Sequence, residues 1–217
     1  MNLYSVYILL NLSVCIPAAF AFARFKYIPR TLIPFCVLLW FAMANELVSL
    51  VIIENGGSNA MNGNFFILAE FLFLGSQFYR WGVFNITKYK AGAVIGVALW
   101  VTDNFILHQL SANNSLCRII FAFLYVFLSM DMVNRHMVLG KGRLYFMHTL
   151  LLVIGLLLFF ACKSFVEVFN AFDMGLTVGF YAHIWFTLSV VNAATNILYA
   201  IALLCIQRKP EFSLLSS

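Results

Sequence analysis

The chain has 217 residues, of which 64% are hydrophobic and only 10% are charged, and its mean hydropathy is +0.96. A water-soluble domain of this length cannot hide so much apolar surface, so the composition excludes a soluble enzyme or binding domain. The formal net charge is +5, and most of the basic residues lie between apolar segments. This placement indicates membrane topology and not a surface that binds nucleic acid. The lipid bilayer is therefore the first predicted partner.

Seven apolar segments occupy almost the entire sequence, and each is close to the ~20 residues that a membrane helix needs. They are expected at residues 4–23, 31–53, 65–82, 91–108, 116–134, 144–163 and 181–206. The gaps between them are short, so the chain is predicted to form a single domain over residues 1–217. Its fold class is predicted to be all-α, a polytopic bundle of seven transmembrane helices whose backbone hydrogen bonds are satisfied within the helices.

Lysine and arginine cluster in alternate gaps between these segments. Eleven of the thirteen basic residues fall in the first, third and fifth gaps or in the C-terminal tail. By the positive-inside rule, the N-terminus is predicted to be outside and the C-terminus in the cytoplasm. The other two, Arg118 and Lys163, are expected at helix ends on the outer side. The eleven are Arg24, Lys26, Arg30, Arg80, Lys88, Lys90, Arg135, Lys141, Arg143, Arg208 and Lys209.

The first apolar segment is expected to be a retained helix and not a cleaved signal peptide. No Lys or Arg precedes it, and Arg24, Lys26 and Arg30 follow it at once. A signal peptide has the reverse arrangement, with its positive charge before the apolar run.

Polar side chains within the apolar segments are the candidates for function, because a charged group at membrane depth costs ~2.5 kcal/mol or more and needs a partner or water. We expect the ligand-binding residues to be Asn45, Glu46, Glu70, Asp103, Asn104, Arg118, His183, Asn192, Asn196 and Tyr199. The last three recur at helical spacing and so share one face of their helix.

The ionisable members of this set, Glu46, Glu70, Asp103, Arg118 and His183, are expected in one layer about 10–15 Å thick in the outer half of the bundle. Three carboxylates from three helices at one level predict an outward-facing polar cavity for a cationic or zwitterionic ligand. Glu46 and Glu70 are expected to share that cavity, with Arg118 as the balancing charge. The alternative interpretation is a set of buried ion pairs and hydrogen bonds that hold the helices together.

Two further patterns concern cysteine and glycine. Cys117 opens the fifth segment and Cys162 closes the sixth, so a disulfide between them at the outer face is one option in an oxidising compartment. Gly92 and Gly96 form a GxxxG motif, which is typical of close helix packing. The chain has no CxxC spacing, and no metal site or cofactor is predicted, although Asp103, His108 and His183 could in principle form a zinc site.

Four short stretches of the chain carry a resemblance to known proteins: Asn45-Glu46-Leu47, Asn62-Gly63-Asn64, the helix around Glu70, and Asn196-Ile197-Leu198-Tyr199. Together they resemble a largely uncharacterised family of small seven-helix bacterial membrane proteins, and similar bundles occur ahead of sensor histidine kinases. The resemblance implies a sensor- or receptor-like module in the bacterial inner membrane that signals through a membrane partner. It implies no particular ligand and no catalytic residue.

The leading hypothesis is therefore a sensory or accessory protein that binds a small molecule, or a lipid, in the outward-facing cavity. A small-solute transporter that uses the intramembrane carboxylates as coupling groups is the first alternative. A membrane-embedded lipid hydrolase is the second. An enzyme is the less favoured class, because no H-x-x-x-H pair of metal-ligating histidines occurs. A retinal protein is not expected either, because the last helix has no lysine for a Schiff base.

Overall fold

The computed structural model describes residues 3–139, 147–172 and 177–206. Within these ranges the chain is helical apart from short connections and contains no β-strand, so the predicted all-α class is confirmed. Part of the charge argument, namely Lys141, Arg143, Arg208 and Lys209, lies outside the described residues. So does the predicted start of the sixth segment at residues 144–146.

The first predicted segment consists of three consecutive pieces. They are α1 (Leu3–Asn11), a 3-10 turn η1 (Leu12–Val14) and α2 (Cys15–Ala23). Pro17 lies in the first turn of α2 and lacks the N–H that would bond to Ser13 one turn earlier. The 3-10 turn directly before it is the local adjustment expected when an α-helical hydrogen bond is removed.

The remaining helices follow in chain order with loops between them. They are α3 (Ile33–Glu54), α4 (Ala60–Arg80), α5 (Ile86–Val101), α6 (Leu116–Leu139), α7 (Met147–Ala171) and α8 (Val178–Leu204). A π-helical segment, η4 (Thr102–Leu107), extends α5.

Six helical segments of the described residues are long and apolar enough to cross a membrane. The first span, α3, α5 with η4, α6, α7 and α8 account for them. Helix α4 has 21 residues but is not one of the six, because Asn64, Glu70 and Gln77 lower its hydropathy. These three polar residues are buried, so the polar side of α4 faces the other helices.

Two glycines explain where α3 and α4 end. Gly56 and Gly82 adopt positive φ angles of 72° and 77°, which only glycine reaches without strain. After α4, Gly82 N–H donates to the carbonyl of Tyr79 and Val83 N–H donates to that of Phe78. This is the Schellman arrangement, which satisfies the last carbonyls of a helix and stops it.

Two helix boundaries differ from the prediction in a way that affects the site. Helix α7 continues to Ala171, about two turns beyond the predicted end at residue 163, so Lys163 lies inside the helix and not at its end. Helix α4 begins at Ala60 and not at residue 65, so Glu70 lies at its midpoint, ~15 Å from its start. Glu70 thus lies deeper than predicted, at the inner edge of the expected layer of about 10–15 Å.

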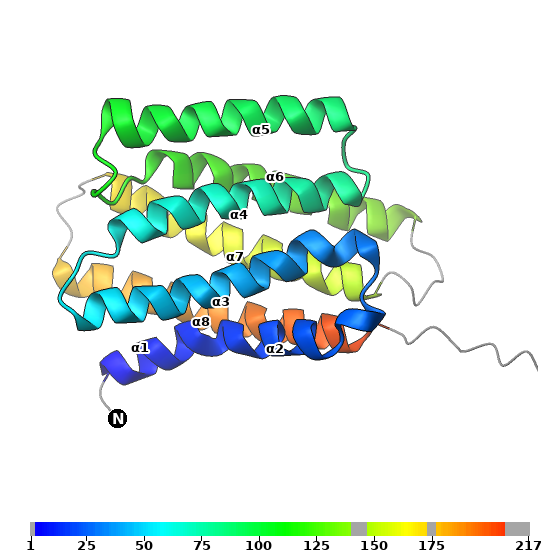
Figure 1. Ribbon diagram of the computed structural model, residues 1–217, viewed down its shortest axis with the longest axis horizontal. Helices are drawn as coiled ribbons and strands as arrows, with labels where there is room; N and C mark the ends of the chain where they lie inside the picture. Colours follow the sequence, from blue (N-terminus) through cyan, green and yellow to red (C-terminus); the bar gives the residue numbers. More distant parts are fainter. Residues whose placement is uncertain (1–2, 140–146, 173–176, 207–217) are drawn as a thin grey trace, which may run out of the picture.

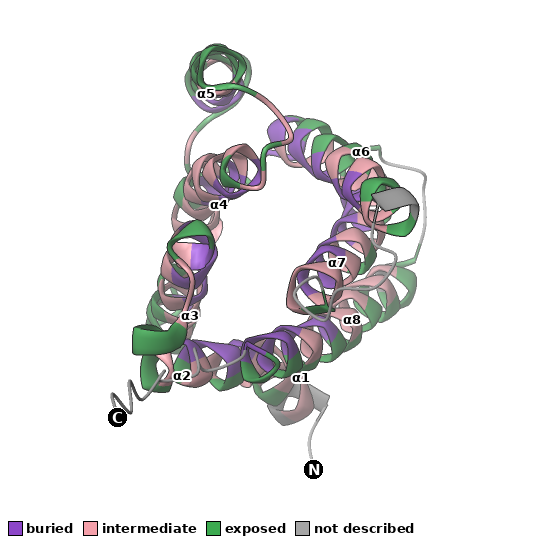
Figure 2. Ribbon diagram, turned by 90° about the vertical axis from the view of Figure 1, so that its right-hand side faces the viewer, coloured by how far each residue is buried: buried purple, intermediate pink, exposed green. Residues whose placement is uncertain are grey.

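Viewed along the bundle, the helices form a ring, and α5 lies outside it (Figure 2). The order around the ring is α1 with α2, then α3, α4, α6, α7 and α8, and α8 closes the ring against α1 and α2. Helix α5 lies outside the ring against α4. This arrangement leaves much of α5 exposed, including Val94 and Ile95, as expected for a lipid-facing helix.

The loop after α2 lies at one end of the bundle, and α1 begins at the other (Figure 1). We call the end that holds the loop 24–32, with Arg24, Lys26 and Arg30, the basic end. The opposite end, where α1 begins, is called the N-terminal end. At the basic end the Arg24 guanidinium donates hydrogen bonds to the carbonyls of Leu203 and Ile206 after α8, where a cation also complements the helix dipole.

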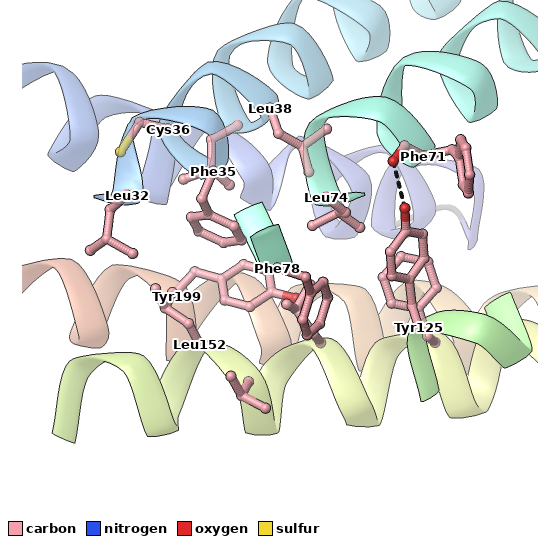
Figure 3. Close-up of a cluster of buried hydrophobic side chains, with 14 of the residues drawn as sticks. Leu32, Phe35, Cys36, Leu38, Phe71, Leu74, Phe78, Tyr125, Leu152 and Tyr199 are labelled. Carbon is pink, nitrogen blue, oxygen red and sulfur yellow. Dashed lines mark hydrogen bonds between the residues drawn. The ribbon is translucent and has the colours of Figure 1, made fainter. Parts of the chain in front are cut away.

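The ring is filled by large side chains over the half nearer the basic end (Figure 3). The rings of Phe35 from α3 and Tyr199 from α8 meet edge to face with their centroids 5.1 Å apart. The Tyr125 hydroxyl of α6 donates to the carbonyl of Phe71 in α4 at 2.5 Å. Side chains from α3, α4, α6, α7 and α8 thus meet in one packed core.

Candidate functional site

The residues predicted to share one site are divided among separate places in the bundle. Four of them take part in hydrogen bonds and ion pairs between α4, η4, α6 and α7: Glu70, Asp103, Asn104 and Arg118. Three others line a cavity between the first span, α3 and α8: Asn45, Glu46 and Asn192. The expected single cavity shared by Glu46 and Glu70 is therefore not formed.

Glu70 forms an ion pair with a residue that the prediction placed at the outer surface. Its Oε2 atom lies 2.6 Å from Nζ of Lys163, and the two side chains are only 10% and 9% exposed. The Lys163 ammonium also lies 5.4 Å from the ring centroids of Phe159 and Phe160. The pair joins α4 to α7 near the middle of the ring. Lys163, and not Arg118, is thus the counterion of Glu70.

Arg118 instead pairs with Glu167 and Asn64. Its Nη1 atom lies 3.5 Å from Oε1 of Glu167, and its Nη2 donates to Oδ1 of Asn64 at 3.0 Å. The second carboxylate oxygen of Glu167 accepts from the Ser115 hydroxyl at 3.1 Å. The expectation that Arg118 balances a Glu46–Glu70 pair is wrong, because its guanidinium is already paired with Glu167 and Asn64. We refer to Asn64, Glu70, Ser115, Arg118, Lys163 and Glu167 as the paired network.

Asp103 and Asn104 stabilise the connection between η4 and α6. Oδ2 of Asp103 accepts from the backbone N–H of Cys117 at 2.9 Å, at the first turn of α6. Its Oδ1 lies 2.9 Å from Nδ1 of His108. Oδ1 of Asn104 accepts from the Asn114 side chain at 3.0 Å. A carboxylate at a helix N-terminus satisfies free N–H groups and complements the helix dipole, so these contacts account for both residues.

The remaining predicted residues have separate surroundings. Asn196 donates from Nδ2 to the Ser13 hydroxyl at 2.8 Å and so links α8 to the first span. Tyr199 is buried in the core, where Gly155 leaves room for its ring: a Cβ added at Gly155 would lie 2.5 Å from the ring. His183 is exposed on α8.

A cavity of about 240 Å³ lies in the N-terminal half of the bundle between the first span, α3, α7 and α8. It extends to Ile53 and Asn59, next to the loop that follows α3. Glu46 lines it about two turns before the end of α3, ~12 Å below that end. We call it the Glu46 cavity.

Several polar side chains of the Glu46 cavity differ from the ionised groups of the paired network because they have no side-chain partner in the part of the chain that the structure describes. Among the described residues, six lining side chains with polar atoms make no side-chain hydrogen bond or ion pair. They are Tyr7, Asn11, Asn45, Glu46, Trp185 and Asn192. Phe159 of α7 also lines the cavity, and its ring centroid lies 5.4 Å from the Lys163 ammonium. The six polar side chains are half-buried, so water or a ligand in the cavity can supply their hydrogen-bond partners.

The sequence analysis missed Lys163 and Glu167 as interior residues. An apolar run that ends at a charge is normally read as the end of a helix, and α7 crosses that point because each charge finds a partner inside the bundle. Their spacing of four residues, which puts both on one helix face, is the signal that could have revealed them.

Neither a metal centre nor a disulfide forms among the described residues. No group of three or more His, Cys, Asp or Glu side chains is placed there to hold a metal ion, so Asp103, His108 and His183 do not assemble a zinc site. Cys117 and Cys162 are both free thiols, and Cys117 is buried.

Comparison with known proteins adds no relative to this description. No protein-family model, no curated protein and no solved structure matches the chain.

Proposed function

We propose that the chain crosses the membrane seven times, with the basic end in the cytoplasm. The clustering of Arg24, Lys26, Arg30, Lys88 and Lys90 at one end supports this orientation. Helix α4 counts as the seventh span in this proposal, since it is long enough and its polar residues face the ring. The family resemblance favours a bacterial inner membrane as the location.

A reporter fused to the C-terminus tests this topology. It should report a cytoplasmic location, and a cysteine introduced at Asn59 or Asn113 should react with a membrane-impermeant maleimide from outside. External labelling of a cysteine introduced at Thr87, in the first turn of α5 at the basic end, would reverse the orientation.

Within this topology, we propose that the protein is a receptor-like membrane protein that binds a small cationic or zwitterionic ligand in the Glu46 cavity. The observation that carries the proposal is the contrast at Glu46. Glu70 and Glu167 each have a basic partner among the described residues, whereas Glu46 faces a cavity with none. An intramembrane carboxylate without a counterion is costly, and a bound cation supplies the missing charge.

The walls of the cavity fit an organic cation of small size. Tyr7, Trp185 and Phe159 offer aromatic rings, and a cation held over such a ring gains ~0.5–2 kcal/mol. Asn11, Asn45 and Asn192 offer amide groups that can bind a hydroxyl or carboxylate on the same ligand. A volume of about 240 Å³ lies just below the ~300 Å³ of the smallest common ligand sites.

The packed core next to the cavity favours sensing over transport. Between the cavity and the basic end, the ring is filled by the core around Phe35, Leu152 and Tyr199. Transport would need that core to open, whereas signalling needs only a shift of one wall. Phe159 is suited to that shift, because it lines the cavity and its ring centroid also lies 5.4 Å from the ammonium of Lys163, which is paired with Glu70 of α4. A membrane partner would then receive the signal.

Thermal unfolding of the purified protein with choline as the probe tests ligand binding. Choline should raise the melting temperature, whereas its neutral isostere 3,3-dimethylbutan-1-ol should not. Glu46→Gln should weaken choline binding by about tenfold or more, because a charge-assisted contact is worth ~1.5–3 kcal/mol. Glu54→Gln is the matched control, since Glu54 is exposed at the end of the same helix.

Two outcomes would contradict this proposal. If choline and a panel of other small amines leave the unfolding of the wild-type protein unchanged, the cavity does not bind organic cations. If protein in liposomes carries labelled choline across the membrane and Glu46→Gln stops this flux, the transporter hypothesis replaces the receptor-like one.

A further inference from the structure

A second cavity of about 240 Å³ lies outside the ring, between α4, α5 and α6 in the half nearer the basic end. Phe71 and Gly75 of α4, Tyr89 and Gly92 of α5, and Leu124 and Leu128 of α6 contribute to its walls. It is separate from the Glu46 cavity, which is bounded by the first span, α3, α7 and α8. The function proposed above does not involve it. We call it the α5 groove.

The two glycines of the GxxxG motif explain why this groove exists. At Gly96, α5 lies so close to α4 that an added Cβ would come within 2.1 Å of the Phe71 ring. At Gly92, one turn nearer the basic end, an added Cβ would meet no atom within 4 Å. Gly96 therefore serves close packing, as a GxxxG motif predicts, whereas Gly92 leaves an open space beside the ring.

The lining of the groove indicates what fills it. Lys88 is the only charged residue among the described residues that line it, and the other lining residues are aliphatic, aromatic or glycine. In a bilayer such a space is filled by hydrocarbon, since water there would find almost no hydrogen-bond partners. The interior of the groove thus fits an acyl chain.

Lys88 indicates which kind of lipid head group would accompany this acyl chain. Its side chain is exposed in the first turn of α5 and makes no hydrogen bond or ion pair with the described residues. Lys90 lies two residues further on, and the one acidic residue on the described part of α6, Asp131, is already paired with Arg135 at 2.8 Å. A lipid phosphate at the membrane surface would neutralise the charge of Lys88.

From these observations we infer that the α5 groove binds one anionic phospholipid, with an acyl chain beside Gly92 and its phosphate at Lys88. A helix from a second copy of this chain fits the site less well, because an apolar helix brings no anion to Lys88. The inference is independent of the ligand in the Glu46 cavity.

Photo-crosslinking tests this inference in liposomes that contain a phosphatidylglycerol with a diazirine in its acyl chain. The crosslinks should concentrate on peptides of α5 and α6 that contain Gly92 and Leu124 or Leu128. Gly92→Phe should fill the groove and remove most of this labelling. Gly179→Phe is the matched control, because an added Cβ at Gly179 also meets no atom within 4 Å and α8 lies elsewhere in the ring.

The charge of the head group is tested by competition between unlabelled phosphatidylglycerol and phosphatidylcholine against the same probe. Phosphatidylglycerol should compete better, and Lys88→Gln should reduce its advantage by about fivefold, the factor that corresponds to ~1 kcal/mol for one lysine at an anionic surface. Lys90→Gln should have a smaller effect.

Three results would overturn the inference, and the first two are obtained with the wild-type protein. Labelling of wild-type protein spread evenly over all the lipid-facing helices would show that no specific site exists. Equal competition by the two lipids would show that the head group is not recognised. Crosslinks from a cysteine introduced at Leu128 to a second copy of the chain would assign the groove to a protein interface.

Discussion

Two polar regions share the N-terminal half of this bundle, and they differ in whether their charges are paired. In the paired network, Glu70 has Lys163 and Glu167 has Arg118 as its partner. In the Glu46 cavity, six polar side chains have no side-chain partner among the described residues. Both regions are built from intramembrane polar residues, so polarity alone does not distinguish a structural role from a functional one.

The cost of burying charge explains why pairing is the informative property. A buried ion pair with good geometry offsets its own desolvation, and so it can persist without any ligand. A half-buried carboxylate without a counterion, such as Glu46, has no such compensation within the described part of the protein. The contrast therefore favours a structural role for the paired network, and it is the basis on which we propose that the Glu46 cavity binds a ligand.

Breaking the Lys163–Glu70 pair should have the largest effect on stability. Lys163→Met leaves the Glu70 carboxylate buried without a partner, which should lower the free energy of unfolding by about 3–5 kcal/mol. Unfolding in mixed dodecyl maltoside and SDS micelles, followed by circular dichroism, measures this loss. Arg135→Met is the matched control, because the Asp131–Arg135 pair is about half exposed and should contribute less than ~1 kcal/mol.

A double variant separates the pair from the packing of its side chains. Replacing both residues, as in Glu70→Leu with Lys163→Met, should recover most of the stability that Lys163→Met loses, since no unpaired charge is left. A double variant as unstable as the single one would show that the two side chains matter for packing and not for charge.

The sequence alone predicts most of the fold, because the bilayer imposes simple rules on it. Apolar runs near 20 residues and alternating basic gaps locate the helices at 31–53 and 116–134 to within a few residues of α3 and of the start of α6. The ring order and the position of α5 outside it depend on side-chain packing between helices. No hydropathy pattern encodes that packing.

The site was harder to predict for two reasons. Hydropathy ends a span at the first charge, which put Lys163 at the end of the sixth predicted segment and Glu167 beyond it, although both are buried within α7. The sequence also does not give the rotation of each helix about its axis. Glu46 and Glu70 are predicted at similar depth on consecutive helices, and similar depth alone does not show whether they face the same cavity. Asn45, Glu46 and Asn192 do line one cavity, whereas their role in binding stays a prediction.

Substitution of Glu46 should have the smallest effect on stability, and it tests the Glu46 cavity as Lys163→Met tests the paired network. Glu46→Gln should change the free energy of unfolding by less than ~0.5 kcal/mol, because the carboxylate has no partner to lose. Glu46→Leu should leave stability unchanged or raise it, since a ligand site often retains polar groups at the expense of stability. The same micelle unfolding assay measures both variants beside Lys163→Met. If Glu46→Gln lowers stability as much as Lys163→Met does, Glu46 holds helices together like Glu70, and the distinction between the two regions fails.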